Sequence, residues 1–248
     1  MFGCFGLPDI WAGFQMYKVG VVCEGPTDQI IIEAVLDRWL DDYVPVSIQP
    51  PRTAVGSDAG VHGAGWKGIR TWCGQEAARE KINGILRNID LLIVQVDADV
   101  QHEHDAEISQ TMPCPPAESG ADAVRKLILN WLALDLLPAR AVLCVPAAAS
   151  ETWILAALFP DAKEIVFSDS RSAEGLECRL DVKSLLRRLG KRLKPKLVIS
   201  QGGKLKNQST GYAAQQNALQ NGWDTVTELC SQAARFDAEL RMALNIET

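Results

Sequence analysis

The fold is decided by Val19-Gly20-Val21-Val22-Cys23, an apolar run that leads directly into Glu24-Gly25-Pro26-Thr27-Asp28. A second run, from Leu91 to Val96, leads into Asp97-Ala98-Asp99. Short apolar runs rich in Val and Ile, bounded by glycine or charge, are typical of parallel strands buried on both faces. The carboxyl ends of such strands meet at one edge of the sheet, where ligands bind. The two acidic clusters are therefore predicted to lie together at that edge.

Such a gathering of carboxylates needs compensation. Like charges that lose hydration raise one another's pKa or destabilise the fold unless a cation offsets them. Hard divalent cations such as Mg²⁺ prefer oxygen ligands and retain waters that a phosphate can displace. The pattern therefore indicates a metal-dependent phosphodiester enzyme.

The rest of the chain is predicted to alternate between helices and strands, which indicates an α/β fold. Ser150 is expected to cap a helix that carries Glu151 in its first turn. The elements predicted before this helix are a helix that Thr27 caps and that extends to Leu40, an edge strand over 44–48, a helix over 75–88, a strand over 91–96, a helix over 121–137 and a strand over 141–145. Those predicted after it are a basic helix over 181–193, a short strand over 196–200 and helices over 212–219 and 225–244.

Residues 49–72 are rich in glycine and are predicted to form a mobile loop. Glycines let backbone amides approach an anion, and Arg52, Lys67 and Arg70 supply positive charge in the same segment. We expect these three side chains to contact an anionic substrate. A disordered insertion is the alternative.

The composition is that of one elaborated domain. The chain has 248 residues, of which 47% are hydrophobic, and no apolar stretch is long enough to cross a bilayer. The expected division is an N-terminal extension over 1–17, a core over 18–160, and a basic, mainly helical elaboration over 161–248. Alternatively, the first residues are upstream sequence and the true start lies near Met16. The seven cysteines are scattered singly, which suggests neither a zinc site nor a disulfide framework and fits a reduced cytoplasm.

The net charge of -6 conceals an uneven distribution. Residues 179–206 contain ten basic residues and one acid, whereas the remainder contains 15 basic and 30 acidic residues. The basic stretch is either a solvated helix face or a surface that follows nucleic-acid phosphates. For the second interpretation, the candidate contacts are Arg187, Arg188, Lys191 and Arg192.

These motifs together resemble the Toprim superfamily, which includes topoisomerases, primases and OLD-type nucleases. The resemblance rests on a strand ending in Glu24-Gly-x-x-Asp28 and a later strand ending in Asp97-x-Asp99, and it covers about residues 18–160. Ser150-Glu151-Thr152-Trp153 is similar to the acidic position of small stand-alone bacterial Toprim proteins and of OLD-type nucleases. The fold this implies is a Toprim-like Rossmannoid parallel sheet flanked by helices.

The resemblance also implies roles for individual residues. Glu24 would be a metal ligand or general acid/base, Asp97 and Asp99 paired metal ligands, and Asp28 and Glu151 ligands that help to hold a second cation. A lysine after the last core strand often supports the transition state in that group, a role that Lys204 or Lys206 could fill. Two ions, Mg²⁺ or Mn²⁺, would then clamp the attacking and leaving oxygens about 3.5–4 Å apart.

The expected function is that of a cytoplasmic bacterial nuclease that hydrolyses DNA or RNA. By resemblance to OLD-type systems, it would serve anti-phage defence beside a separately encoded ATPase. Two alternatives remain open: a non-catalytic Toprim-fold module that binds nucleic acid or a partner, and a nucleotide-sugar transferase that uses the Asp-x-Asp motif with a metal.

Overall fold

The computed structural model describes residues 16–50, 62–74, 78–108, 110–163 and 173–246. It is an α/β structure, as the sequence predicts, built on a four-stranded sheet in which every neighbouring pair of strands is parallel. The strand order is β2-β1-β3-β4. The strands are β1 (Tyr17–Val22), β2 (Tyr43–Gln49), β3 (Leu91–Gln95) and β4 (Ala141–Cys144). β2, which contains Pro45, lies at an edge, as expected.

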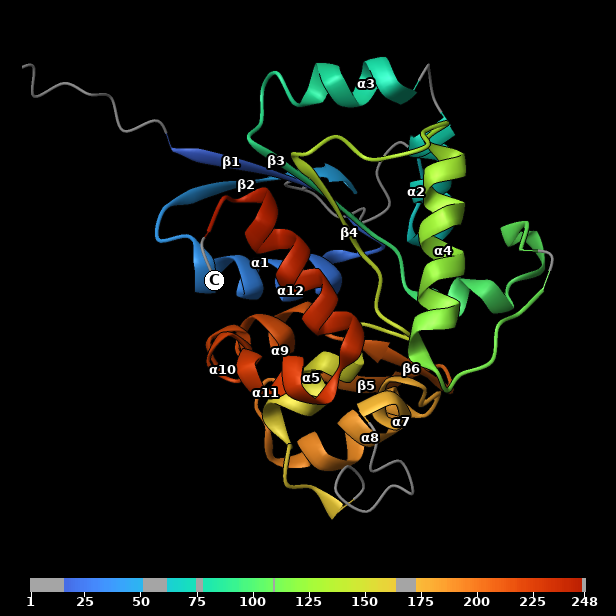
Figure 1. Ribbon diagram of the computed structural model, residues 1–248. Helices are drawn as coiled ribbons and strands as arrows, with labels where there is room; N and C mark the ends of the chain where they lie inside the picture. Colours follow the sequence, from blue (N-terminus) through green and yellow to red (C-terminus); the bar gives the residue numbers. More distant parts are fainter. Residues whose placement is uncertain (1–15, 51–61, 75–77, 109, 164–172, 247–248) are drawn as a thin grey trace, which may run out of the picture.

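Helices cover both faces of the sheet (Figure 1). Side chains of a strand alternate between the faces, so Val19 and Val21 enter one core and Val22 enters the other. The first core contains α1 (Pro26–Trp39), α5 (Glu151–Leu158) and the C-terminal elements. The second contains α2 (Gly65–Gly74), α3 (Ala78–Ile85) and α4 (Ala117–Trp131).

The C-terminal elements pack into the same core as the sheet. Trp153 of α5 stacks on Phe236 at a ring distance of 6.0 Å and meets Trp223 edge-on at 5.5 Å. These aromatic contacts hold two C-terminal helices against α5. The elements after α5 are α7 (Ala173–Glu177), α8 (Val182–Leu189), the 3-10 helix η3 (Gly190–Arg192), β5 (Val198–Gln201), β6 (Lys204–Asn207), α9 (Ser209–Ala213), α10 (Gln216–Asn221), α11 (Trp223–Leu229) and α12 (Ser231–Ala243).

β5 and β6 form an antiparallel hairpin outside the main sheet. Its turn is Gly202-Gly203, where both residues have positive φ, 59° and 76°. Glycine adopts this left-handed conformation without a steric penalty, so the pair suits a tight two-residue hairpin turn. The sequence predicts the first strand of this hairpin but not the second.

Several predicted boundaries are wrong. α2 occupies the second half of the segment predicted to be a loop, and α4 ends at Trp131 rather than near Leu137. Gly25, not Thr27, is the N-cap of α1, because Pro26 already occupies the first helical turn. A single helix predicted over 225–244 is instead α11 and α12, which meet at Cys230 in an extended conformation.

The structure contains a disulfide bond between Cys114 and Cys178, which the scattered cysteines did not suggest. The two residues are 64 positions apart, and only the fold brings their Cα atoms to 5.4 Å. Disulfides are rare in a reduced cytoplasm, so this pair removes the support that the cysteines gave to that location. Cys23, Cys73, Cys144 and Cys230 are free and buried. Within the described ranges, no helix is both long and apolar enough to cross a membrane.

Candidate functional site

The carboxyl edge of the sheet brings the two acidic motifs into direct contact. The backbone N–H of Asp97, which follows β3, donates to Glu24 Oε1 at 2.8 Å, and Glu24 follows β1. Gln95 connects the same residues, because its Oε1 accepts from the Glu24 N–H at 3.0 Å and its Nε2 donates to Asp97 Oδ1 at 2.8 Å. Gln95 is only 1% exposed. A buried amide at the end of an apolar strand thus positions both carboxylates.

Asp28 joins this cluster from the first turn of α1. Ser150 Oγ donates to Asp28 Oδ1 at 2.5 Å, and the Ser150 backbone N–H donates to Asp97 Oδ1 at 3.2 Å. Ser150 is the N-cap residue of α5, as predicted, but its hydroxyl makes no cap hydrogen bond. The hydroxyl instead links α1 to the loop after β4.

Glu151, the first residue of α5, completes the buried part of the cluster. Its Oε1 accepts from Asn207 Nδ2 at 2.5 Å and lies 3.0 Å from Lys183 Nζ. The residue is 3% exposed, and its second oxygen, Oε2, has no hydrogen-bond partner in the described part of the chain. An ionised oxygen in that position is poorly compensated.

Asp99 lies at the exposed side of the cluster, in the 3-10 helix η1 (Ala98–His102). It borders a cavity of about 90 Å³ together with Glu151, Arg179 and Lys183. One water needs about 10–15 Å³ of such space, so the cavity admits several waters or a partly hydrated ion. The acidic cluster is therefore buried at Asp28 and Glu151 and open to solvent at Asp99.

Burial and mutual repulsion raise the pKa values of these acids. Desolvation, followed by the charge of Asp28, raises the pKa of Glu24 to about 8. Desolvation and then Glu151 raise the pKa of Asp28 to about 7, and desolvation followed by Asp28 raises the pKa of Asp97 well above its ordinary value. The pKa of Asp99 shifts less. Desolvation raises it to about 6, and the positive charge of Lys183 opposes this rise. A nearby cation would reverse these shifts.

The donor set fits a hard divalent cation. All five side chains offer carboxylate oxygens, which Mg²⁺ and Mn²⁺ prefer, and the Glu151 Oε2 atom is buried without a partner among the described residues. Within the same residues, however, no three His, Cys, Asp or Glu side chains are already arranged around one ion position. Glu24, Asp28, Asp97 and Glu151 each use one oxygen for a protein hydrogen bond. Since no three of these acids surround one point, bringing their remaining oxygens around an ion requires side-chain rotation within the cluster.

The lysine that pairs with Glu151 is Lys183, which was not predicted from the sequence. Its pKa is raised, because the charges of Glu151 and its neighbours outweigh the desolvation that opposes the charged form. Lys204 and Lys206, the predicted candidates, are exposed on β6 and alternate with Leu205 and Asn207. Since Asn207 faces Glu151, the alternation directs both lysines to the other face of the hairpin. Their catalytic role stays a prediction.

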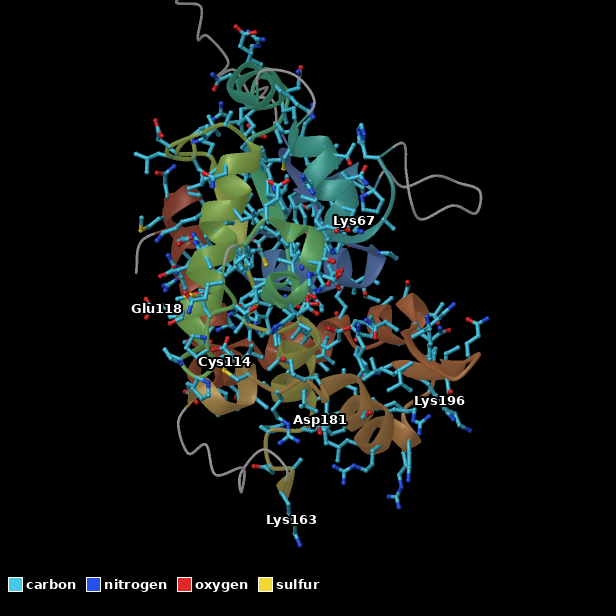
Figure 2. All side chains as sticks on the ribbon, turned by 90° about the vertical axis from the view of Figure 1, so that its right-hand side faces the viewer. Lys67, Cys114, Glu118, Lys163, Asp181 and Lys196 are labelled. Atoms are coloured by element: carbon cyan, nitrogen blue, oxygen red, sulfur yellow. A yellow bond between two sulfur atoms is a disulfide. The ribbon has the colours of Figure 1, made fainter. Side chains whose placement is uncertain are left out.

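The four basic residues predicted to follow phosphates are exposed on one segment. Arg187 and Arg188 lie in α8, and Lys191 and Arg192 lie in η3. Figure 2 shows many nitrogen-tipped side chains projecting from this part of the molecule, around the labelled Lys196. The segment follows Lys183 directly, so the positive surface begins at the acidic cluster.

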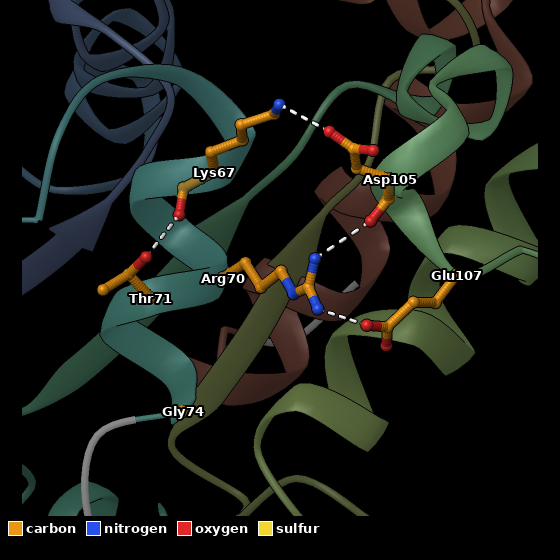
Figure 3. Close-up of a pocket in the computed structure, with 6 residues that line it drawn as sticks. All are labelled: Lys67, Arg70, Thr71, Gly74, Asp105 and Glu107. Carbon is orange, nitrogen blue, oxygen red and sulfur yellow. Dashed lines mark hydrogen bonds and ion pairs between the residues drawn. The ribbon is translucent and has the colours of Figure 1, made fainter.

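Lys67 and Arg70 lie on α2, beside a cavity of about 760 Å³ (Figure 3). Lys67 pairs with Asp105 of the 3-10 helix η2 (His104–Ala106) at 2.8 Å, and Arg70 pairs with Glu107 and donates to the Asp105 carbonyl. These partners neutralise much of the positive charge that the sequence analysis assigned to an anionic substrate. Arg52 lies outside the described residues.

Three residues that shape the site, Gln95, Lys183 and Asn207, were missed from the sequence. Gln95 carries a readable signal, because a polar side chain in a buried strand must find hydrogen-bond partners. Ser150 was noticed, but in another role. Lys183 and Asn207 gave no local signal, since tertiary packing of α8 and β6 against α5 alone brings them to Glu151.

Comparisons with protein-family models, with curated proteins and with solved structures give no match for this chain.

Proposed function

We propose that the protein is a divalent-metal-dependent hydrolase of phosphodiester bonds in nucleic acids, with a Toprim-like arrangement of its acids. The observation that carries the proposal is the cluster of five carboxylates at the carboxyl edge of the sheet, which Lys183 contacts through its ion pair with Glu151. Five acids and one lysine leave a large excess of negative charge. A pair of Mg²⁺ or Mn²⁺ ions offsets that excess and activates the attacking and leaving oxygens when bound.

The residues of the chain divide the remaining tasks. The charges of all four other acids act on Asp97. Asp97 would therefore be the ligand that two cations share, with Glu24, Asp99, Asp28 and Glu151 as further ligands. Glu24 would serve as a cation ligand, or, with no cation next to it, would keep the pKa of about 8 that lets it hold or release a proton near neutral pH. Lys183 at the border of the cavity offers a positive charge to a phosphate. The basic surface of α8 and η3 then holds the flanking strand.

A cleavage assay tests the proposal. The protein is incubated with single-stranded and duplex DNA and with RNA, in Mg²⁺, in Mn²⁺ and in a chelator. We expect cleavage that needs the metal and that Asp97→Asn abolishes, because the asparagine keeps the shape but loses the charge of the ligand. Asp135→Asn, an exposed acid outside the cluster, is the matched control and retains activity. Absence of cleavage of every substrate in both metals contradicts the proposal and favours a non-catalytic binding module.

A further inference from the structure

A groove of about 450 Å³ lies between α8, η3 and β5. Its floor is apolar: Leu186, Leu197 and Val198 are almost fully buried there, and Ile199 is the half-buried apolar side chain that a ligand can reach. Its rim carries the exposed side chains of Arg187, Lys191 and Lys196. The groove therefore joins two different surfaces, one that favours apolar contact and one that favours anions.

The rim cations are available to a ligand. Within the part of the chain that the structure describes, Arg187, Lys191 and Lys196 form no ion pair with an acid, unlike Lys67 and Arg70 on α2. An unpaired cation on the surface can release its counterions to a phosphate without first breaking an internal bond. The rim is thus the stronger of the two candidate phosphate-binding surfaces.

Helix α8 lines both the groove and the cavity beside the acidic cluster. Arg187 follows Lys183 by four residues on α8, which places the two side chains on the same face about 6 Å apart along the axis. β6, which pairs with the groove strand β5, carries Asn207 to Glu151. A chain of phosphates that enters the cluster at Lys183 therefore meets the groove next.

We propose that the groove binds an unpaired nucleic-acid strand and thereby makes single-stranded nucleic acid, or an unpaired end, the preferred substrate. This inference rests on the proposed function of the acidic cluster. In a duplex the bases are stacked inward, so a duplex presents phosphates to the rim and leaves the apolar floor without a partner. An unpaired strand offers both a phosphate backbone for the cations and an exposed base for the floor. The volume lies in the range of pockets that enclose small molecules, which suits one or two nucleotides.

Fluorescence anisotropy in a chelator measures this preference without any contribution from cleavage. The probes are short labelled single strands of DNA and of RNA, and a blunt duplex of the same length. We expect the wild-type protein to bind a single strand about fivefold more tightly than the duplex, the effect of burying the exposed part of the Ile199 side chain against a base. Equal or tighter binding of the duplex overturns the proposal. The DNA and RNA arms show which of the two sugars the groove accepts.

Two variants separate the rim from the floor. The rim variant R187Q/K191Q/K196Q is expected to reduce the slope of log K against log salt by about 2, since three phosphate contacts on a single strand are lost. Its control removes three exposed basic residues elsewhere, K18Q/R87Q/K126Q, and retains the wild-type slope. The floor variant Ile199→Thr keeps a β-branched side chain in β5 and is expected to lose the preference for single strands while the slope stays unchanged.

A rim variant that behaves like its control, or a floor variant that keeps the preference, contradicts the proposal. Failure here is distinguishable from failure of the proposed function. If the single strand binds through the rim but no substrate is cleaved in metal, the groove is correct and the hydrolase assignment is wrong. If cleavage depends on Asp97 but the duplex binds as well as the single strand, the hydrolase assignment is correct and the groove proposal is wrong.

Discussion

Asp97 and Glu24 are joined by a hydrogen bond of 2.8 Å from a backbone N–H to a carboxylate oxygen, although 73 residues separate them in sequence. Gln95 makes further hydrogen bonds to both residues. Neutral donors therefore hold the two acidic motifs together without a cation. Charge-assisted bonds of this kind position the carboxylates but do not remove their net negative charge, which leaves the cluster dependent on protons or metal ions.

Protons supply the first testable consequence. The folded-state pKa values of Glu24 and Asp28, about 8 and about 7, lie above their ordinary values of 4.5 and 3.8. Both groups therefore bind protons more tightly when folded, so their stabilising contribution is complete below about pH 4 and is lost as the pH rises through 7 to 8. Calorimetric melting of the metal-free protein should show a melting temperature that falls as the pH rises from about 4 to 8. Glu24→Gln should make this dependence on pH weaker. A melting temperature that rises between pH 6 and 8.5 contradicts the raised pKa values.

The second consequence concerns Asp97→Asn without metal. The substituted side chain would keep the oxygen that accepts from Gln95 and Ser150 while removing one like charge from the cluster. We expect stabilisation at pH 8 by about 1 kcal/mol, or roughly 2–4 °C in melting temperature. Asp135→Asn serves as the control for loss of an exposed charge. A variant that melts below the wild type in a chelator shows that the charge of Asp97 is already well compensated.

A third prediction tests the pair formed by Lys183 and Glu151. The lysine side chain is 49% exposed and that of the glutamate 4%, so the pair is intermediate between surface and buried ion pairs. Lys183→Gln leaves a buried carboxylate without its cation and should cost about 1–2 kcal/mol, between the ranges for the two classes. Glu151→Gln in the same chain should recover most of this loss. Strictly additive effects in the double-mutant cycle, measured by urea unfolding, mean that the two groups do not interact.

The disulfide gives a fourth prediction. Cys178 immediately precedes Arg179, which borders the cavity beside Asp99, and its bond to Cys114 ties this wall to the segment before α4 (Figure 2). A crosslink over 64 residues lowers the conformational entropy of the unfolded chain, which stabilises the folded state by about 4 kcal/mol. Reductant should lower the melting temperature of the wild type and leave that of Cys114→Ser/Cys178→Ser unchanged. Identical melting of the wild type with and without reductant contradicts a stabilising bond.

The sequence predicted the sheet because local composition determines it. Val19 to Val22 and Leu91 to Gln95 are apolar enough to be strands buried on both faces, and the positions of Glu24, Asp97 and Asp99 follow from where those strands end. Glu151 was placed correctly at the start of a helix, because Ser150 directly before it is a residue that favours the N-cap position.

The remainder depends on contacts between distant segments. Nothing near Lys183, Asn207 or Cys114 in sequence indicates Glu151 or Cys178 as a partner. The glycines of the predicted loop also concealed α2, whose Gly68 is required because a Cβ there would lie 2.3 Å from the Gly63 carbonyl oxygen. Glycine selected for close packing is locally indistinguishable from glycine selected for flexibility.

Calorimetric titration with Mn²⁺ near pH 8 tests whether the five carboxylates hold divalent cations. We expect two bound ions in the wild type, one in Glu151→Gln because the second position loses a ligand, and severe weakening of both in Asp97→Asn. Asp135→Asn should titrate like the wild type. Absence of Mn²⁺ binding at millimolar concentration, or full stoichiometry in Asp97→Asn, would contradict the account.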